Sequence, residues 1–318
     1  MRRIDRIILS AREQSKNLDY EINATTGATL SGISDDVFLE WTDHAQDHLQ
    51  AAILASYPNE FVESTIISLV GATDEYTIPD RVFVNNKIIS VEYSHSGNAS
   101  DYMPLGQGSF RDRNSDVGYP RFYIRRGKKL IVNPTPNDSS GTLRVHYYRE
   151  LDDLDIRRGV VNGVPSGTSL IVNGATDAAP SAVEEVRFAA AEYVCICDIA
   201  GEPLLYNAQV VSYNAGSNTF TFAANVSTYL VTGGTLAGLD NQYVTLKAYS
   251  STHSKLPDNC ERYIQTYAQK RALSNDKQNG DITEDAELLL MEKDILQSFA
   301  EDSRDIQSFQ IIDEEIMW

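Results

Sequence analysis

The sequence predicts an α+β protein in which N- and C-terminal helices form a bundle packed with an antiparallel β-sandwich, plus an inserted small all-β barrel or sandwich module. Apolar residues recur at helical spacing at both ends of the chain, and apolar and polar residues alternate between about 61 and 150. From about 157 to 251, short β-prone runs lie between Gly-, Ser- and Asn-rich turns. These three patterns together predict the fold class.

The composition is that of an acidic globular protein. The chain has 318 residues, of which 42% are hydrophobic and 23% are charged, so wholesale disorder is not expected. It carries 27 Lys and Arg against 45 Asp and Glu, a formal charge of −18. Because an acidic surface repels phosphate backbones, we expect no sequence-wide nucleic-acid binding. No apolar run approaches the roughly 18–20 residues of a membrane span, so no membrane partner is expected.

Two helices are predicted near the N-terminus. The basic start of the chain is like that of a signal peptide, but its apolar part is too short, so a helix is the better interpretation. The apolar residues of this helix are Ile4, Ile7, Ile8 and Ala11. Ser34 is a good N-cap for the second helix, which Tyr57-Pro58 ends. Its apolar stripe consists of Val37, Trp41, Ala45, Leu49, Ala52 and Ile53.

Strands are predicted through the middle of the chain. A hairpin is expected over residues 122–132, with its turn at Arg126-Gly127. Two other strands have alternating apolar positions, which are Ile89, Val91, Tyr93 and Leu143, Val145, Tyr147. In the later segment, strands are expected at residues 169–172, 193–197, 209–213, 219–222 and 243–247.

The change in amino-acid composition along the chain predicts the domain organisation. We expect residues 1–155 and 252–300 to form one discontinuous core of helices and β-sandwich. Residues 156–251 would be an inserted β module with a separate core. The extension of residues 301–318 is too polar to fold by itself, so we expect it to become ordered on a partner.

Two helices are also predicted near the C-terminus. Asp258, with Glu261 three residues later, forms a pattern typical of a helix start. Thr283 is expected to cap the last helix, whose apolar stripe ends at Phe299.

No motif indicates catalysis. His44 and His48 are one helical turn apart, a spacing at which two histidines can share a metal ion. Asp43 and Asp47 flank them but no third ligand is suggested nearby, so a solvated polar face is the better interpretation. The run 106–108 lacks the third glycine of a dinucleotide-binding loop. We therefore expect no enzyme, no catalytic residue, no metal and no cofactor.

The three cysteines are too few for a disulfide framework. Cys195 and Cys197 are two residues apart, which on a strand is poor geometry for a bridge. We expect reduced, partly buried thiols, as in a cytosolic protein.

Charge is distributed unevenly along the chain. Between Arg111 and Lys129, seven basic residues outnumber two acids, and from Glu284 onward eleven acids outnumber two basic residues. Opposite charges on one chain predict a contact between neighbouring subunits, and two separate solvated surfaces are the alternative. The residues assigned to this interface are Arg111, Arg113, Arg121, Arg125, Arg126, Lys128, Lys129, Asp313, Glu314, Glu315, Ile316 and Trp318.

Several segments carry a family resemblance. They are the helix of residues 36–50, the stretches 76–80, 90–93, 118–124, 130–136 and 143–149, the pair Leu151 and Leu154, and Leu256-Pro257-Asp258. In this order they resemble the head-to-tail adaptor, or connector, proteins of tailed bacteriophages. The likeness covers about residues 1–155 and 255–300, and the β insert departs from the pattern of the family.

The resemblance implies a structural virion protein, made in the host cytoplasm and located at the head–tail junction. It implies a dodecameric ring that docks on the portal protein and on a tail, tail-tube or nozzle protein. DNA would pass through without specific binding, because an acidic lumen repels it at every position. The acidic C-terminal extension is expected to reach a neighbouring subunit or the portal.

Two other functions stay open at this point. The alternative is a tail-associated glycan-binding or glycan-cleaving protein, in which tyrosines of the β module stack on sugars. A tail-tube or decoration protein is the third.

Overall fold

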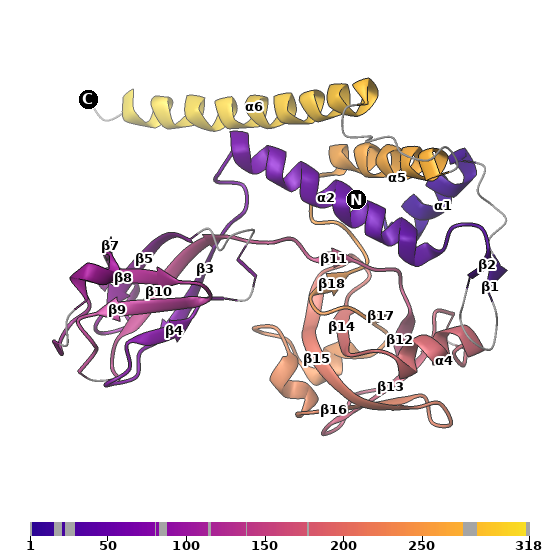
Figure 1. The fold of residues 1–318 in the computed structure, drawn as a ribbon, viewed down its shortest axis with the longest axis horizontal. Helices are drawn as coiled ribbons and strands as arrows, with labels where there is room; N and C mark the ends of the chain where they lie inside the picture. Colours follow the sequence, from indigo (N-terminus) through magenta and orange to yellow (C-terminus); the bar gives the residue numbers. More distant parts are fainter. Residues whose placement is uncertain are drawn as a thin grey trace. The chain divides into compact units, whose positions relative to one another are not determined.

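The computed structural model describes residues 2–15, 21–22, 29–79, 81–82, 88–113, 116–137, 139–176, 178–275 and 285–315. Within these residues the fold is mixed α+β, with five α-helices, several sheets and a small closed barrel (Figure 1). The α-helices are α1 (Ile4–Ser15), α2 (Asp35–Ser56), α4 (Ala182–Ala189), α5 (Glu261–Asn275) and α6 (Ala286–Glu315). The short 3-10 helices are η1 (Ala99–Asp101), η2 (Phe110–Asp112), η3 (Val226–Tyr229), η4 (Leu236–Leu239) and η5 (Asp258–Cys260).

The chain divides into two compact units. Unit 1 comprises residues 1–52 and 152–318, and unit 2 comprises residues 53–151. The barrel therefore belongs to the same unit as the terminal helices. These limits differ from the predicted ones, and an independent module at 156–251 stays a prediction, as does a partner-ordered extension at 301–318.

The barrel of unit 1 has six strands in the order β12-β13-β16-β15-β14-β17. They are β12 (Gly159–Val161), β13 (Ser169–Gly174), β14 (Tyr193–Cys197), β15 (Pro203–Asn214), β16 (Thr219–Phe222) and β17 (Tyr243–Thr245). Buried apolar side chains, among them Leu170, Phe188 and Phe220, fill it. Of the two predicted forms, barrel or sandwich, the structure has the small barrel, and the five strand predictions coincide with β13 to β17 apart from their ends.

Two short strand pairs complete unit 1. β11 (Asp153–Leu154) lies parallel to β18 (Ser250–Ser251), where the chain enters and leaves the barrel. β1 (Glu21–Ile22) and β2 (Thr29–Ser31) form an antiparallel hairpin between α1 and α2.

Helices α1 and α2 begin as the sequence predicts. All four apolar residues of the predicted α1 stripe are buried. The Ser34 hydroxyl accepts a hydrogen bond from the Val37 amide at 3.3 Å, so Ser34 caps α2. The predicted stripe of α2 is only partly right, because Phe38 and Leu39 are buried while Val37 and Trp41 are half-buried.

Polar side chains on one face of α2 join this helix to the barrel. Arg158 donates to Asp36 at 2.8 Å and to Asp155 at 3.0 Å. Arg158 and Asp155 are 6% and 1% exposed, so the ion pair is buried. Burial opposes the ionisation of Asp36, but the Arg158 guanidinium outweighs this effect and holds the pKa of Asp36 below its ordinary value.

The same face continues seven and ten residues further along α2. Asp43 accepts from the Leu154 amide and from the Lys247 ammonium, each at 2.5 Å. Gln46 donates to the Asp152 carbonyl at 2.8 Å and accepts from the Ser254 hydroxyl at 2.5 Å. Residues separated by seven and by three positions share one face of a helix, so α2 contacts both chain ends of the barrel.

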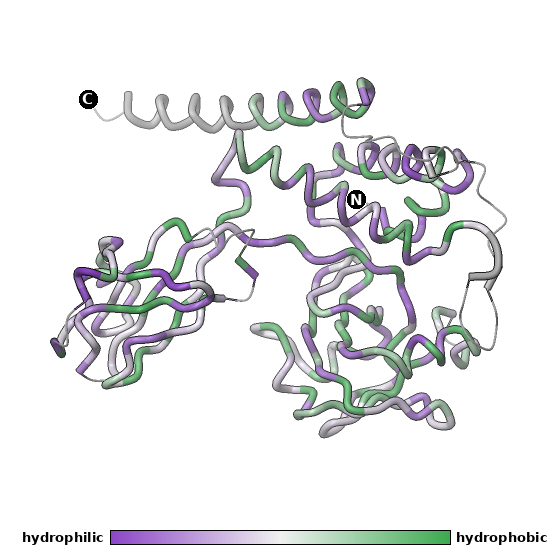
Figure 2. The backbone as a smooth tube through the Cα atoms, viewed as in Figure 1, coloured by the Kyte–Doolittle hydropathy of each residue, from purple (hydrophilic) through white to green (hydrophobic). Residues whose placement is uncertain are grey.

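Unit 2 consists of two four-stranded sheets, ordered β3-β10-β5-β6 and β4-β9-β8-β7. The strands are β3 (Val62–Ser68), β4 (Glu75–Thr77), β5 (Ile88–Ser94), β6 (Met103–Pro104), β7 (Gly106–Gln107), β8 (Phe122–Arg126), β9 (Lys129–Asn133) and β10 (Thr142–Tyr148). Side chains from both sheets, such as Val91, Leu130 and Val145, share one core. Hydrophobic and hydrophilic residues alternate along many of these strands (Figure 2). The packing of a helical bundle on a β-sandwich stays a prediction.

The alternation predicted for β10 is confirmed, whereas that for β5 is wrong at one position. Val91 and Tyr93 are buried, but Ile89 is exposed. Opposite β10, Tyr147 pairs with Ile88 and His146 with Ser90, so Ile89 is an extra residue in β5. Such a bulge reverses the alternation, which directs Ile88 to the core in place of Ile89.

Three helix starts differ from the predicted ones. Helix α4 was not predicted, although Ser181 accepts a hydrogen bond from the Glu184 amide and this Ser-x-x-Glu pattern is typical of a helix start. Asp258 opens the 3-10 turn η5 instead of capping α5. Asp285 accepts from the Glu287 and Leu288 amides and caps α6. The predicted cap Thr283 lies outside the described residues.

All three cysteines are free and fully buried, so the expectation of partly buried thiols understated their burial. Burial raises the pKa of Cys195 to about 11 and that of Cys260 to about 12, and it also raises the pKa of Cys197. Among the described helices, none combines the length and the apolar character needed to cross a membrane.

We predict that Arg158→Met destabilises unit 1 by about 3–5 kcal/mol, because Asp155 is then a buried charge without its partner. Urea denaturation followed by circular dichroism measures this loss. The control is Arg262→Met at an exposed position of α5, which should change stability by less than about 0.5 kcal/mol. A loss below about 1 kcal/mol for Arg158→Met would contradict the structural role of the ion pair.

The buried thiols predict a loss of stability in alkali. Their folded-state pKa values are raised, so the neutral thiols contribute stability that is complete below the unfolded-state pKa near 9 and is lost as the pH rises towards 11–12. The free energy of unfolding measured between pH 8 and 11 should fall accordingly. At pH 8 a thiol reagent should label the native chain far more slowly than the urea-unfolded chain, and rapid native labelling would contradict this burial.

Candidate functional site

The predicted basic residues lie on unit 2, and four of them surround one tight turn. β8 and β9 form a hairpin whose last pair is Arg126 opposite Lys129. The turn between them is Gly127-Lys128, one residue later than predicted. Gly127 has a φ of +56°, which glycine adopts without strain at the first central position of a two-residue hairpin turn.

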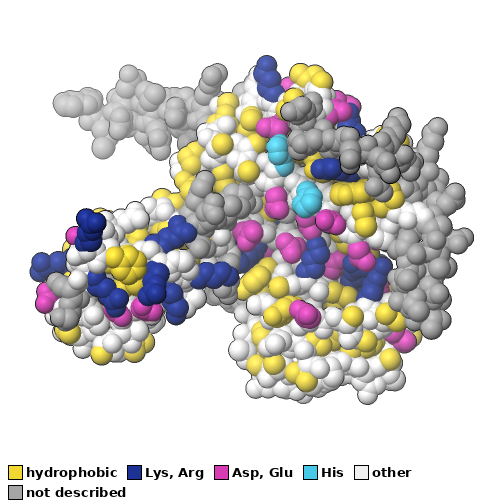
Figure 3. Space-filling view, viewed as in Figure 1, with side chains coloured by type: hydrophobic (Ala, Val, Ile, Leu, Met, Phe, Trp, Pro, Cys, Tyr) yellow, Lys and Arg dark blue, Asp and Glu magenta, His cyan; other side chains and the backbone are white. Residues whose placement is uncertain are grey.

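Three of the charges around this turn, those of Arg126, Lys128 and Lys129, are not neutralised by the rest of the described chain. Arg126, Lys128 and Lys129 are exposed and make no ion pair with a described residue, while Arg125 is half-buried. Arg126 and Lys129 are directly opposite each other across the strands, an arrangement that is unfavourable for like charges. Lys and Arg side chains gather on the visible face of unit 2 (Figure 3). An acidic partner would relieve this repulsion.

The other three basic residues have different surroundings. Arg111 is exposed in η2. Arg113 forms an ion pair with Asp74 at 2.5 Å, so its charge is already matched within unit 2. Arg121 precedes β8 and borders an open hollow of about 490 Å³, lined also by Asp116, Val117, Gly118, Tyr119, Phe122, Asn133 and Pro134.

Large exposed apolar side chains, which were not predicted, accompany the basic ones. Phe110, Val117 and Tyr119 are each at least half exposed. Tyr119 packs edge-on against His95 at 4.8 Å between ring centroids. Exposed aromatic residues beside arginine are the usual composition of a protein interface. The sequence signal was the alternation of aromatic and basic residues between Phe110 and Phe122.

The acidic half of the predicted interface lies at the C-terminal end of α6. The helix continues to Glu315, whereas its predicted apolar stripe ended at Phe299. Asp313, Glu314 and Glu315 form its last turn, where no basic residue occurs. Negative charge is unfavourable at the C-terminal end of a helix because it adds to the negative pole of the helix dipole. Ile316 and Trp318 lie outside the described residues.

The two units differ in net charge. Unit 2 contains eleven basic and eleven acidic residues, so its formal charge is zero. The entire charge of −18 therefore belongs to unit 1, which has 16 basic and 34 acidic residues. Separate copies of the chain thus offer an acidic unit and a unit with a locally basic surface.

The His44 and His48 face is less solvated than predicted. His44 and Asp47 are exposed, but Asp43 is bound to Lys247 and Leu154. Burial raises the pKa of Asp43 to about 6, although the Lys247 ammonium opposes this shift. His48 contacts the Glu292 carboxylate of α6 at 2.9 Å. The prediction of a solvated face is therefore wrong for Asp43 and His48, because α2 packs on the barrel and near α6.

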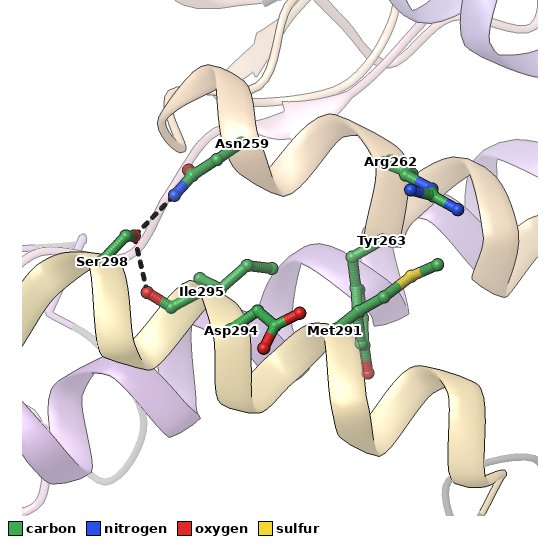
Figure 4. Close-up of a pocket in the computed structure, with 7 residues that line it drawn as sticks. All are labelled: Asn259, Arg262, Tyr263, Met291, Asp294, Ile295 and Ser298. Atoms are coloured by element: carbon green, nitrogen blue, oxygen red, sulfur yellow. Dashed lines mark hydrogen bonds between the residues drawn. The ribbon is translucent and has the colours of Figure 1, made fainter.

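No metal site or catalytic centre follows from these contacts. No three His, Cys, Asp or Glu side chains of the described residues come together as a metal ion would require. A hollow of about 260 Å³ lies between α6 and the segment of η5 and α5, lined by Asn259, Arg262, Tyr263, Met291, Asp294, Ile295 and Ser298 (Figure 4). In it, Asn259 donates to Ser298 at 2.7 Å, and Ser298 donates to the Ile295 carbonyl. These contacts join two helices and leave no nucleophile with an adjacent base.

Comparison with known proteins identifies one family. The family model described as SU10 adaptor protein matches residues 15–193, more than half of the chain. The match runs from the end of α1 to the first residue of β14 and includes all of unit 2. No curated protein matches the chain.

Proposed function

Because the chain belongs to the SU10 adaptor protein family, we propose that it forms a ring that connects the portal of a phage capsid to the tail and lets DNA pass. The family description indicates a phage adaptor-type protein with a structural rather than an enzymatic role. The match over residues 15–193 is the observation that carries this proposal. The virion partners are then the portal protein and a tail protein, and the ring is expected to be dodecameric.

The charges support a contact between neighbouring subunits. A closed ring requires two different surfaces, one on each side of every subunit. The basic turn of unit 2, with Arg125, Arg126, Lys128 and Lys129, is one such surface. The acidic last turn of α6 in the next copy is the other, because cations placed there would stabilise the end of the helix. Arg111 and Arg121, with Phe110 and Tyr119, would extend the first surface, whereas the charge of Arg113 is already engaged by Asp74.

The charge of unit 1 supports the passage of DNA without binding. Every contact between a basic side chain and a phosphate releases counterions and strengthens binding, so a sliding channel must avoid such contacts. Unit 1 carries the whole net charge of −18. A ring that turns unit 1 towards the channel would repel DNA along its length.

We predict that Arg126→Glu/Lys128→Glu/Lys129→Glu weakens ring formation about tenfold at roughly 0.1 M salt, since several exposed charge pairs of about 0.2–1 kcal/mol each are lost. The three side chains are exposed, so the fold of unit 2 should not change. Sedimentation velocity and negative-stain images measure the assembly. Release of reducing sugar from host glycan, assayed on the same samples, would instead favour the glycan-cleaving alternative.

Two further variants control this experiment. Arg6→Glu/Arg262→Glu changes charge at two exposed positions of unit 1 and should leave assembly unchanged. By itself, Asp313→Lys/Glu314→Lys/Glu315→Lys should weaken assembly. When these substitutions and the triple substitution of unit 2 are combined in one chain, assembly should be restored. Assembly that is indifferent to the triple variant and to salt would contradict the charge contact.

Removal of residues 302–318 is expected to abolish attachment of the ring to its neighbours while the rest of the chain stays folded. The deletion removes the last half of α6, including its acidic last turn, and leaves in place the buried residues of unit 1 that the structure describes, the last of which is Phe299. Co-sedimentation with purified portal complexes, together with circular dichroism, measures both effects. Unimpaired attachment of the shortened chain would show that the extension has no role in assembly.

A further inference from the structure

Strand β3 has one edge without a partner strand. It is the outermost strand of the sheet β3-β10-β5-β6. The Leu69 amide donates to Gly141 and the Arg149 amide donates to Phe61, at 2.9 and 2.8 Å. In an antiparallel pair the bonded residues alternate, so the odd-numbered residues of β3 bond to β10. The amides and carbonyls of the even-numbered residues therefore point to the open edge.

These even-numbered residues, Val62, Ser64, Ile66 and Ser68, are all exposed. No described residue forms a hydrogen bond with their backbone groups at the open edge. Ile66 is 61% exposed and Val62 is 43% exposed, so the face beside this edge carries two exposed apolar side chains that alternate with the two serines. Unpaired backbone groups next to apolar side chains form a template for a further strand.

The edge also lacks the features that usually prevent such pairing. β3 is seven residues long, contains no Lys, Pro or Gly, and pairs with β10 without a bulge. Its one charge, Glu63, is ion-paired with Arg149 at 3.5 Å. The other edge strands of unit 2 are shorter: β4 has three residues, and β6 and β7 have two each. β3 is thus the accessible edge.

The chain itself contains a strand pair that lacks a third strand. The β1–β2 hairpin forms a sheet of two strands, with two and three residues, and no other described strand pairs with it. A two-stranded hairpin is at best marginally stable in water, and a third strand stabilises it. The hairpin belongs to unit 1 and β3 belongs to unit 2.

We propose that the open edge of β3 binds the β1–β2 hairpin of a second copy of this chain, which adds to the sheet of unit 2 as a further strand. The contact joins two different surfaces, as ring closure requires, and in this respect the inference rests on the proposed function. Main-chain hydrogen bonds provide the affinity, and Val62 and Ile66 would pack beside the side chains that the new strand places on the same face of the sheet. Unlike the charge contact, this pairing is insensitive to salt.

Hydrogen exchange resolved to single amides tests the edge directly. In the monomer, the amides of Ser64 and Ile66 should exchange rapidly. On assembly their exchange should slow by at least tenfold, because they then donate to the added strand. The amides of Thr65 and Ile67, already bonded to β10, are the internal control. Rings in which Ser64 and Ile66 exchange as fast as in the monomer would overturn the inference while leaving the proposed function intact.

A pair of variants at one position separates the backbone effect from that of the side chain. Ser64→Pro removes an amide that faces the open edge and leaves the bonds to β10, so the monomer should fold and assembly should be lost. Ser64→Ala keeps the amide and should assemble normally. If Ser64→Pro assembles as well as Ser64→Ala, the inference fails. Should Ser64→Pro not fold, the exchange measurement on the unaltered chain decides.

Cross-linking identifies the added strand. Leu30→Cys and Ile66→Cys variants, prepared separately and then mixed, should be joined by a short bismaleimide only in the mixture. The three native cysteines are buried and contribute little background. Joining of Ile66→Cys to itself would indicate a two-fold β3–β3 pairing and overturn the inference. Hairpin-to-β3 cross-links in open chains without rings would support the inference and contradict the proposed function.

Discussion

The buried ion pair of Arg158 with Asp155, which the exposed Asp36 extends to the start of α2, is the constraint on which unit 1 depends. The three residues come from two segments. Asp36 lies at the start of α2, whereas Asp155 and Arg158 lie where the chain enters the barrel. A guanidinium this deeply buried is tolerated only beside its carboxylates, so the helix and the barrel have to meet in one register. Asp43 and Gln46 repeat the same kind of contact along α2, which explains why the barrel and the N-terminal helix form one compact unit.

The net charge of the protein is distributed unequally between its two compact units. The net negative charge belongs entirely to unit 1, while unit 2 is neutral overall but locally basic around the Gly127-Lys128 turn. The two proposed subunit contacts differ in their physical character. Contacts between charges are long-ranged and weakened by salt, whereas strand addition at β3 is short-ranged and set by backbone geometry. Charge would bring copies together, and the strand contact would fix their register.

The sequence predicted which charged residues belong to the candidate interface, but it did not predict which of them are exposed and unpaired. Seven basic residues in a short segment are visible as a run, whatever the fold. Whether each is exposed, half-buried like Arg125, or ion-paired like Arg113 depends on neighbours that are distant in the sequence. The burial of Asp43 also depends on distant residues. Helical spacing places Asp43 on the polar face of α2, but in the structure it is bound by Lys247. Local patterns carry no information about partners a hundred residues away.

The sequence by itself determined the α+β class, the apolar face of α1, the extent of α2, the strands of a small all-β module and the alternation of β10, because spacing, caps and alternation are local properties. Tertiary structure decided the rest. It put the barrel in one unit with the helices, directed Ile88 rather than Ile89 into the core through a bulge, and left one edge of β3 unpaired. These features arise when separate segments compete for the same neighbours, and that competition is resolved only when the whole chain is packed.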